Sequence, residues 1–178
     1  MYSAVLLLFN ALCAIINRVN NLTKKICINA VIAGLYAALT LLLAPISFGP
    51  LQLRVAEALT ILPALMPFSV WGVAVGCLIS NIFYPLMGIY DVIFGTLITL
   101  AAALLTSRLK NMWIAPLPPV LLNAFLLPLV WYFALNETAY WLNVLTIFAG
   151  QTLALYAVGI PLYAVMKRSV LPLIFKEN

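Results

Sequence analysis

The sequence predicts an all-α integral membrane protein with six transmembrane helices and with both termini in the cytoplasm. First, 66% of the 178 residues are hydrophobic and only 7% are charged, whereas soluble domains carry about 25% charged residues. Second, the apolar residues form successive runs whose lengths suit a bilayer, which a helix of about 20 residues crosses. Third, the basic residues cluster beside alternate runs, as they do in cytoplasmic loops.

Prolines and polar residues divide the apolar sequence into six segments. The first segment stops before Pro45. The stretch 55–90 is too long for one helix, and Pro63 and Pro67 interrupt it, so we divide it into a short second span and a third span. The predicted spans are 26–44, 55–66, 68–86, 91–107, 113–135 and 140–166.

The positions of the basic residues support this division. With six spans and a cytoplasmic N-terminus, all three basic clusters fall on the cytoplasmic side, as the positive-inside rule requires. A single span over 55–90 would place the later clusters outside. The clusters are Arg18, Lys24 and Lys25 before the first span, Arg108 and Lys110 after the fourth, and Lys167, Arg168 and Lys176 after the sixth.

The length and the spans predict one multi-pass membrane domain over residues 26–168. Residues 1–25 are expected to form an N-terminal overhang that is interfacial or disordered. Within it, 4–16 is apolar but too short to cross, and its positive charge follows the run, whereas a signal peptide carries it in front. Residues 169–178 are expected to form a cytoplasmic tail.

The composition disfavours most catalytic and metal chemistry. The chain has no histidine, which removes the commonest general base and metal ligand. Its cysteines, Cys13, Cys27 and Cys77, lie in apolar runs without CxxC spacing, and we interpret them as buried hydrophobes. The sequence contains no Walker-type phosphate loop. We therefore expect no enzyme activity, no metal site and no cofactor, and the placement of the charges argues against a nucleic-acid partner.

The remaining charged residues fall at or just below the predicted outer face. Arg54 and Glu57 begin the second span three residues apart, so they share a helix face and can pair. Asp91 begins the fourth span, where the helix dipole favours a carboxylate. One interpretation is structural, an Arg–Glu pair and a helix cap. The other is a ligand pocket open to the outside, because ionisable groups in a membrane usually face a partner or a water-filled cavity.

The pocket interpretation groups the outer acids with amides and aromatic rings. Carboxylates accept from amidine-like N–H edges and from ammonium groups, and rings stack on flat solutes. Each ring alone also fits an interfacial aromatic belt. The expected guest is small, planar and rich in hydrogen-bond donors, and a positive charge on it would suit the acids. The candidate substrate-binding residues are Arg54, Glu57, Asn81, Tyr84, Asp91, Asn123, Trp131, Trp141 and Gln151.

The first span carries small residues at helical spacing. Ala33 and Ala37, and likewise Gly34 and Ala38, form small-xxx-small pairs that let helices approach closely. This face suits either packing inside the chain or docking of another membrane subunit. The predicted spans place no carboxylate at the bilayer midplane, so an importer built on this chain is better served by a partner ATPase than by an internal proton relay.

The sequence resembles the QueT family in four blocks, "LAPISFGPLQLRVAEALTILPAL", "GCLISNIF", "DVIFGTLITLAAALLTSRL" and "APLPPVLLNA". The resemblance covers about residues 26–167. Members of this family are substrate-binding S components of energy-coupling factor (ECF) transporters for queuosine precursors. The resemblance implies a six-helix S-component fold in the bacterial plasma membrane, and a 7-deazaguanine base or nucleoside as the solute. It also implies an ECF module, made of one transmembrane T component and two ATPases, as the partner.

The same resemblance implies roles for particular residues. Ala33 and Ala37 match the alanine motif by which S components dock on the T component. Gln151 departs from the family pattern, which has an acidic residue there, and this departure would shift the preferred precursor. An S component for another planar vitamin-like solute, such as a flavin or a pterin, and a solitary secondary transporter stay open as alternatives. The pocket residues that fall in matching blocks are Arg54, Glu57, Asp91, Asn81 and Asn123.

Overall fold

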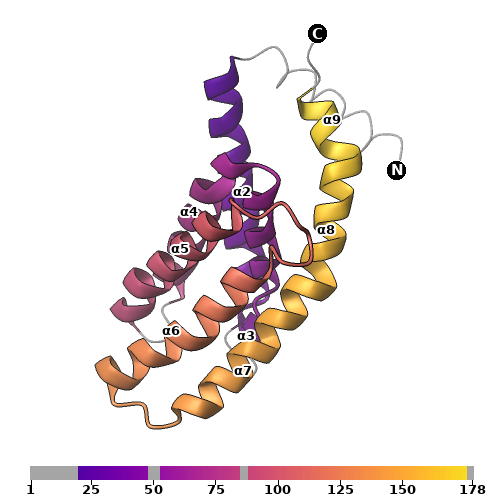
Figure 1. The fold of residues 1–178 in the computed structure, drawn as a ribbon. Helices are drawn as coiled ribbons and strands as arrows, with labels where there is room; N and C mark the ends of the chain where they lie inside the picture. Colours follow the sequence, from indigo (N-terminus) through magenta and orange to yellow (C-terminus); the bar gives the residue numbers. More distant parts are fainter. Residues whose placement is uncertain (1–19, 48–52, 85–87, 176–178) are drawn as a thin grey trace.

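The computed structural model describes residues 20–47, 53–84 and 88–175, and all regular structure within these ranges is helical. The helices form a bundle that is elongated along one direction (Figure 1). The described chain begins and ends at one end of this bundle, and the connection over 107–116 lies toward that end. The turn over 136–139 lies at the opposite end. The basic residues of 24–25, 108–110 and 167–168 therefore belong to segments at or toward the same end of the molecule.

The first long helix, α2, spans Asn21–Leu42. It begins with a side-chain cap, because the Asn20 carboxamide oxygen accepts hydrogen bonds from the backbone N–H groups of Leu22 and Thr23. This cap places the helix start before the predicted span boundary at residue 26. A short helix, α3 (Ala44–Ser47), follows directly and contains Pro45 near its start.

The stretch after α3 divides where the prolines predict. The 3₁₀-helix η1 spans Val55–Ala64, and the chain then breaks at Leu65 and Met66. The short η2 (Pro67–Ser69) leads without interruption into α4 (Val70–Phe83). The predicted boundary between the second and third segments is therefore confirmed. A 3₁₀-helix has about three residues per turn, so side chains three apart in η1 stack on one side.

The second half of the chain contains three further helical rods. The π-helical segment η3 (Asp91–Gly95) runs into α5 (Thr96–Thr106), and α6 spans Leu117–Leu135. α6 ends at Asn136, which takes the left-handed conformation that asparagine tolerates, with φ of 54°. The last rod extends into the residues expected to form the tail. Its parts are α7 (Tyr140–Leu153), η4 (Ala154–Gly159), α8 (Ile160–Val165), η5 (Met166–Val170) and α9 (Leu171–Ile174).

Three helices of the described chain are long and apolar enough to cross a membrane, namely Asn21–Leu42, Leu117–Leu135 and Tyr140–Val170. Three shorter apolar helices, Val55–Ala64, Pro67–Phe83 and Asp91–Thr106, match the other predicted spans in position. The described part of the chain is thus all-helical, and its apolar helices and composition are those of a membrane protein. The count of six crossings and the cytoplasmic location of both termini stay predictions.

α2 packs closely against α4 at a glycine. A Cβ atom at Gly76 would lie 2.6 Å from the Cβ of Tyr36 and 2.9 Å from the carbonyl oxygen of Ala33, so only glycine permits this approach. Ala33 and Ala37 are both buried inside the chain. The structure therefore does not present these two alanines on the surface, where a partner would meet them. The small residues of α2 that are exposed are Ala30, Gly34 and Ala38.

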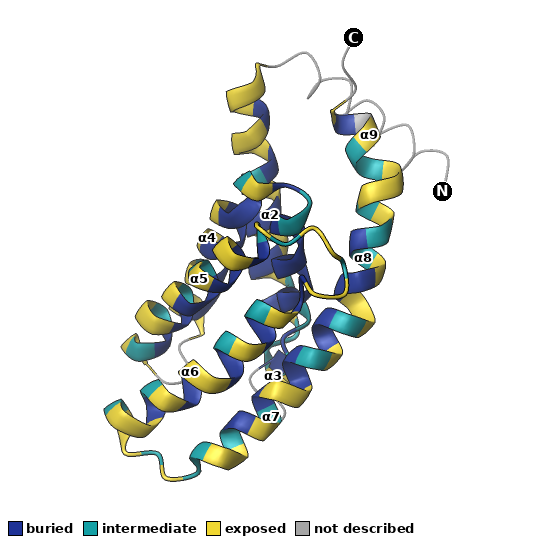
Figure 2. Cartoon of the chain, viewed as in Figure 1, coloured by how far each residue is buried: buried dark blue, intermediate teal, exposed yellow. Residues whose placement is uncertain are grey.

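The burial pattern is that of a bundle with an apolar exterior. Figure 2 shows buried residues on the inward faces of the helices and exposed residues on the outward faces. Many of the exposed side chains are large and apolar, which suits contact with lipid chains. Examples are Leu22, Leu35, Leu42, Trp71, Phe83, Phe133 and Leu145.

The two ends of the described chain are joined by contacts between α2 and α9. The Lys24 ammonium group donates to the backbone carbonyl of Ile174 and lies 4.9 Å from the centre of the Phe175 ring. The Phe175 ring in turn packs edge-on against Phe68, with centroids 6.2 Å apart. These contacts fix the end of the last rod against the first helix.

Candidate ligand site

Glu57 lies at the meeting point of three helical rods in the interior. It is 1% exposed, and its Oε1 accepts a hydrogen bond of 2.6 Å from the Tyr36 hydroxyl of α2. Gln151 of α7 lies beside the same carboxylate. Arg54 comes three residues before Glu57, and with about three residues per turn the two side chains lie on the same side of η1. Arg54 is close enough to interact electrostatically with both Glu57 and Asp91.

Asp91 is held by residues of two other helices. Its carboxylate Oδ1 accepts a hydrogen bond of 2.8 Å from the Trp131 indole N–H of α6. Its backbone carbonyl accepts one of 3.0 Å from the Asn81 amide of α4. Asp91, Asn81 and Trp131 are all buried. The acid at the start of the fourth predicted span is therefore tied into the interior and does not point to lipid.

A cysteine and a threonine extend the same group of polar residues. The Cys77 thiol donates to Thr99 Oγ1 at 3.4 Å, and its sulfur accepts from the Asn81 amide at 3.5 Å. Cys77 is also close enough to Glu57 and Arg54 to interact with both. α4 and α5 thus contribute polar side chains to the same group as Glu57 of η1 and Asp91 of η3.

Asn123 of α6 and Gln151 of α7 lie at one level of the bundle. Asn123 falls on the face of α6 that carries Val120 and Leu127, and Gln151 falls on the face of α7 and η4 that carries Ile147 and Leu155. The two faces share apolar clusters on either side of these polar residues. The shared pairs are Val120 with Leu155, and Leu127 with Ile147.

We call these residues together the polar cluster. Every helical rod of the described chain contributes at least one buried member. The members are Tyr36, Arg54, Glu57, Cys77, Asn81, Asp91, Thr99, Asn123, Trp131 and Gln151.

Several polar atoms of the cluster have no hydrogen-bond partner within the described structure. Five of them belong to the acid and the amides, namely Glu57 Oε2, Asn81 Oδ1, Gln151 Oε1 and both amide atoms of Asn123. Buried polar groups in folded proteins are nearly always satisfied, and each one left without a partner costs about 1–3 kcal/mol. The unsatisfied atoms are therefore available to a bound molecule. Four of them are acceptors and one is a donor.

Seven of the nine predicted site residues lie in the polar cluster, and two lie elsewhere. Tyr84 is half-exposed at the end of α4. Trp141 is 69% exposed at the start of α7, where its ring packs against Tyr140 at 5.1 Å between centroids. These positions are those of an aromatic belt at a membrane interface.

Three members of the cluster were not predicted as site residues from the sequence. Tyr36 stands in the middle of an apolar helix, Cys77 reads as a small hydrophobe, and Thr99 is an ordinary residue of a membrane span. Only the spacing of Tyr36 after Ala33 carried a signal, since both fall on the small-residue face that meets α4. Their roles come from contacts between helices, which spacing along the chain does not show.

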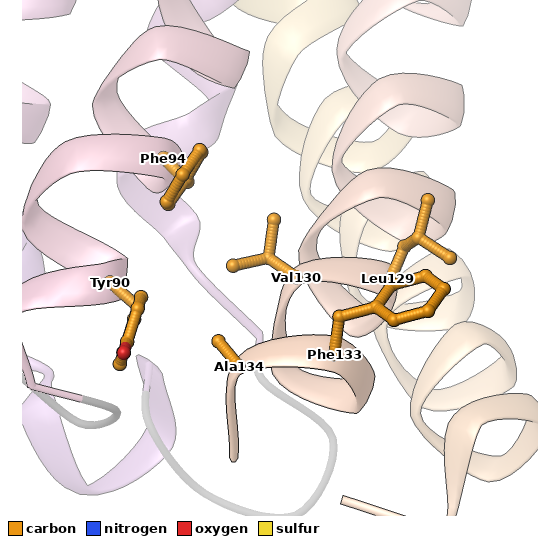
Figure 3. Close-up of a pocket in the computed structure, with 6 residues that line it drawn as sticks. All are labelled: Tyr90, Phe94, Leu129, Val130, Phe133 and Ala134. Carbon is orange, nitrogen blue, oxygen red and sulfur yellow. The ribbon is translucent and has the colours of Figure 1, made fainter. Parts of the chain in front are cut away.

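An open cleft of about 410 Å³ lies next to the cluster, between η3 and α6. In Figure 3, Tyr90 and Phe94 stand on one side of the cleft, facing side chains of α6. The walls carry no charged group and no amide, so the cleft offers little to a polar guest. The residues that line it on α6 are Leu129, Val130, Phe133 and Ala134.

The described ranges contain no group of three histidine, cysteine, aspartate or glutamate residues that could hold a metal ion. The chemistry of the polar cluster is accordingly that of hydrogen bonding and charge, supplied by carboxylates, amides, a guanidinium group and hydroxyls. Such a set can bind and orient a small polar molecule in an apolar surrounding.

Comparison with known families gives one decisive match, because the family model described as QueT transporter matches residues 26–168. This chain belongs to the QueT transporter family. The resemblance inferred from the four sequence blocks is therefore confirmed over nearly the same residues. Membership makes the chain a membrane transport protein and agrees with its apolar helices. Searches among curated proteins and among solved structures returned no match.

Proposed function

We propose that this chain is the substrate-binding S component of an ATP-driven ECF importer, and that it captures an extracellular queuosine precursor. The precursor would be a 7-deazaguanine base or its nucleoside. The observation that carries the proposal is the polar cluster, in which individual atoms of buried amides and of a carboxylate lack hydrogen-bond partners inside a membrane transport protein. A membrane protein keeps such groups where a ligand or water meets them.

The chemistry of the cluster suits a deazaguanine. Its ring presents adjacent N–H donors and one carbonyl, and the free atoms of the cluster are mainly acceptors. Glu57 offers a carboxylate that can take two N–H groups of a guanine-like edge. Asp91 would offset a positive charge on an aminomethyl substituent, since its carboxylate lies in the first turn of η3, at the start of the fourth predicted span. These features favour the deazaguanine over a flavin, whose ring system presents more acceptors.

We further propose that an ECF module supplies the energy. Glu57 of η1 and Asp91 of η3 are hydrogen-bonded to side chains of neighbouring helices. An external ATPase would supply the energy without a path for protons through these acids. Docking on the T component was expected through Ala33 and Ala37. Because α4 covers these residues, we now place the docking face on α2 at the exposed small residues beside them, Ala30, Gly34 and Ala38.

A bulky residue at Gly34 tests the docking face. A Cβ atom there would meet nothing within 4 Å, so Gly34→Leu should fold normally and bind the solute with unchanged affinity. Transport in vesicles that contain the ECF module should fall at least fivefold. A control substitution at an exposed position of another helix, Leu145→Phe in α7, should leave transport unchanged. Normal transport by Gly34→Leu would show that the T component docks elsewhere.

Binding of purified protein tests the proposed solute. Thermal unfolding and titration calorimetry should show binding of aminomethyl-deazaguanine or queuine, and no binding of riboflavin. Uptake into vesicles should then require both the ECF module and ATP. Riboflavin binding would support an S component for another solute. Uptake driven by a proton gradient without the module would support a solitary transporter.

A further inference from the structure

We infer that the guest binds with its 2-amino edge at the inner end of the polar cluster, where Asn123 and Gln151 act with Glu57 as the specificity-determining residues. This inference rests on the proposed function. It states which edge of the deazaguanine forms hydrogen bonds with these three residues, and which edge points outward.

The residues of the polar cluster lie at different depths in the bundle. Asp91 and Trp131 bond each other near the α6–α7 turn, the predicted outer side, because Trp131 lies one turn before α6 ends at Leu135. At the other end of the same helix pair, the Thr106 hydroxyl donates to the Ala115 carbonyl at 3.1 Å. Because α5 and α6 run antiparallel between these two bonds, Asn123 lies well inside Asp91. Glu57 likewise lies one turn further along η1 than Arg54.

An apolar layer closes the inner end of the polar cluster. Directly inside the level of Asn123 and Gln151, apolar side chains close the bundle. Val120 of α6 packs there with Ile61 of η1 and Leu155 of η4. Polar groups of a guest cannot pass this layer without losing their hydrogen bonds. Asn123 and Gln151 therefore form the deepest polar level that a guest entering from the outer side would reach.

The deepest polar level presents more acceptors than donors. Gln151 Oε1 and Glu57 Oε2 are free acceptors, and Asn123 offers both a free oxygen and a free amino group. The complement is an edge with at least two N–H groups beside one carbonyl. In a 7-deazaguanine this is the edge formed by the 6-carbonyl, the ring N–H and the 2-amino group. The substituted five-membered ring then points outward, toward Arg54 and Asp91.

The inference has a consequence for selectivity. The protein should tolerate different substituents on the five-membered ring, because they face the outer side. It should reject changes to the inner edge, because a buried acceptor without its donor is costly. We expect wild-type protein to bind 7-deazaguanine at least tenfold more tightly than 7-deazahypoxanthine, which lacks the 2-amino group. Methylation of the 2-amino group should weaken binding at least as much.

The experiment combines this ligand pair with variants in titration calorimetry. In Gln151→Leu, the preference for 7-deazaguanine over 7-deazahypoxanthine should fall from tenfold or more to about threefold or less. Asn123→Leu should weaken both ligands by about tenfold, since both keep the carbonyl. Asn143→Ala, an amide removed from α7 outside the polar cluster, should change neither the affinities nor the preference.

The outcomes separate the inference from the proposed function. If wild-type protein binds no deazapurine, the proposed function is wrong. If it binds 7-deazaguanine but treats the 2-amino and 2-deamino ligands alike, or if Gln151→Leu keeps the full preference, the proposed function stands and the assigned edge is wrong. The wild-type ligand series also decides the orientation if a variant does not fold. Loss of binding on enlarging the five-membered-ring substituent, with tolerance of 2-amino methylation, would reverse the orientation.

Discussion

Two neighbouring regions between the same helices offer opposite surroundings to a small molecule. The cleft between η3 and α6 is open and apolar, whereas the polar cluster is closed and contains polar atoms without partners. Asp91 and Trp131 belong to the cluster, and their sequence neighbours Tyr90 and Val130 line the cleft. The direction in which a side chain leaves its helix thus decides whether it lines the cleft or joins the polar cluster. On the proposed function, the chemistry of the cluster, rather than the open volume of the cleft, marks the site of a polar solute.

The largest effect should follow from neutralising the acid at the centre of the cluster. Glu57→Gln should weaken binding of a deazaguanine by about 10- to 100-fold, because a hydrogen bond to a charged group is worth about 1.5–3 kcal/mol. The thermal unfolding temperature of the ligand-free protein should not fall. The matched control is Glu137→Gln in the α6–α7 turn, where the carboxylate accepts only from the nearby Ala139 N–H in the described structure. Equal affinities in both variants would assign Glu57 to structure alone.

A second effect should separate the two acids of the cluster. Asp91→Asn keeps an oxygen that can accept from the Trp131 indole, but it removes the negative charge. The affinity for the cationic aminomethyl-deazaguanine should fall about fivefold to tenfold more than that for the neutral cyano-deazaguanine. Calorimetry with both ligands measures this difference. An equal loss for both would mean that the substituent lies away from Asp91.

A smaller effect should follow from removing the hydroxyl that holds Glu57. Tyr36→Phe deletes the bond of 2.6 Å to the carboxylate, and it keeps the Cβ that lies close to Gly76. The expected loss of affinity is about threefold to tenfold, as for one neutral hydrogen bond. Tyr163→Phe is the control, because it removes a hydroxyl that donates to the Lys110 carbonyl at 3.0 Å outside the cluster. A loss in the control as large as in Tyr36→Phe would indicate a general effect on stability.

The smallest effect should come from the cleft. Phe133 is 74% exposed and lines the open cleft, so Phe133→Ala should enlarge the cleft and change the affinity for the solute less than twofold. Titration of the variant beside wild-type protein measures this. A tenfold loss would place the guest in the cleft and would contradict the assignment to the polar cluster.

Much of the fold could be predicted because it depends on local composition. The prolines at 63 and 67 predicted the break after η1, and the apolar runs predicted the helices that the structure contains. The rotation of each helix about its axis could not be predicted in the same way. Ala33 and Ala37 were expected to face a partner, but the close approach of α4 at Gly76 turns them inward. α2 carries apolar residues on all of its sides, so its hydropathy pattern does not indicate which side faces the interior.

The members of the polar cluster could be predicted in part for a related reason. Charged and amide residues are costly in a membrane, so their presence alone marked Glu57, Asp91, Asn123 and Gln151. Aromatic residues are common at interfaces and carry no such mark. Trp131 and Trp141 look alike in the sequence, yet one is buried against Asp91 and the other is exposed. Tyr36 joins the cluster only because α2 and η1 meet.

The sequence by itself determined the class of protein, the family and the small set of polar residues that the chain carries, because these follow from composition and from local order. Only the tertiary structure decided which of them come together. Tyr36 and Glu57 are 21 positions apart, and Asp91 and Trp131 are 40 positions apart, so their hydrogen bonds depend on how separate helices pack. Packing places each polar group where another can satisfy it, or leaves its atoms free for a guest.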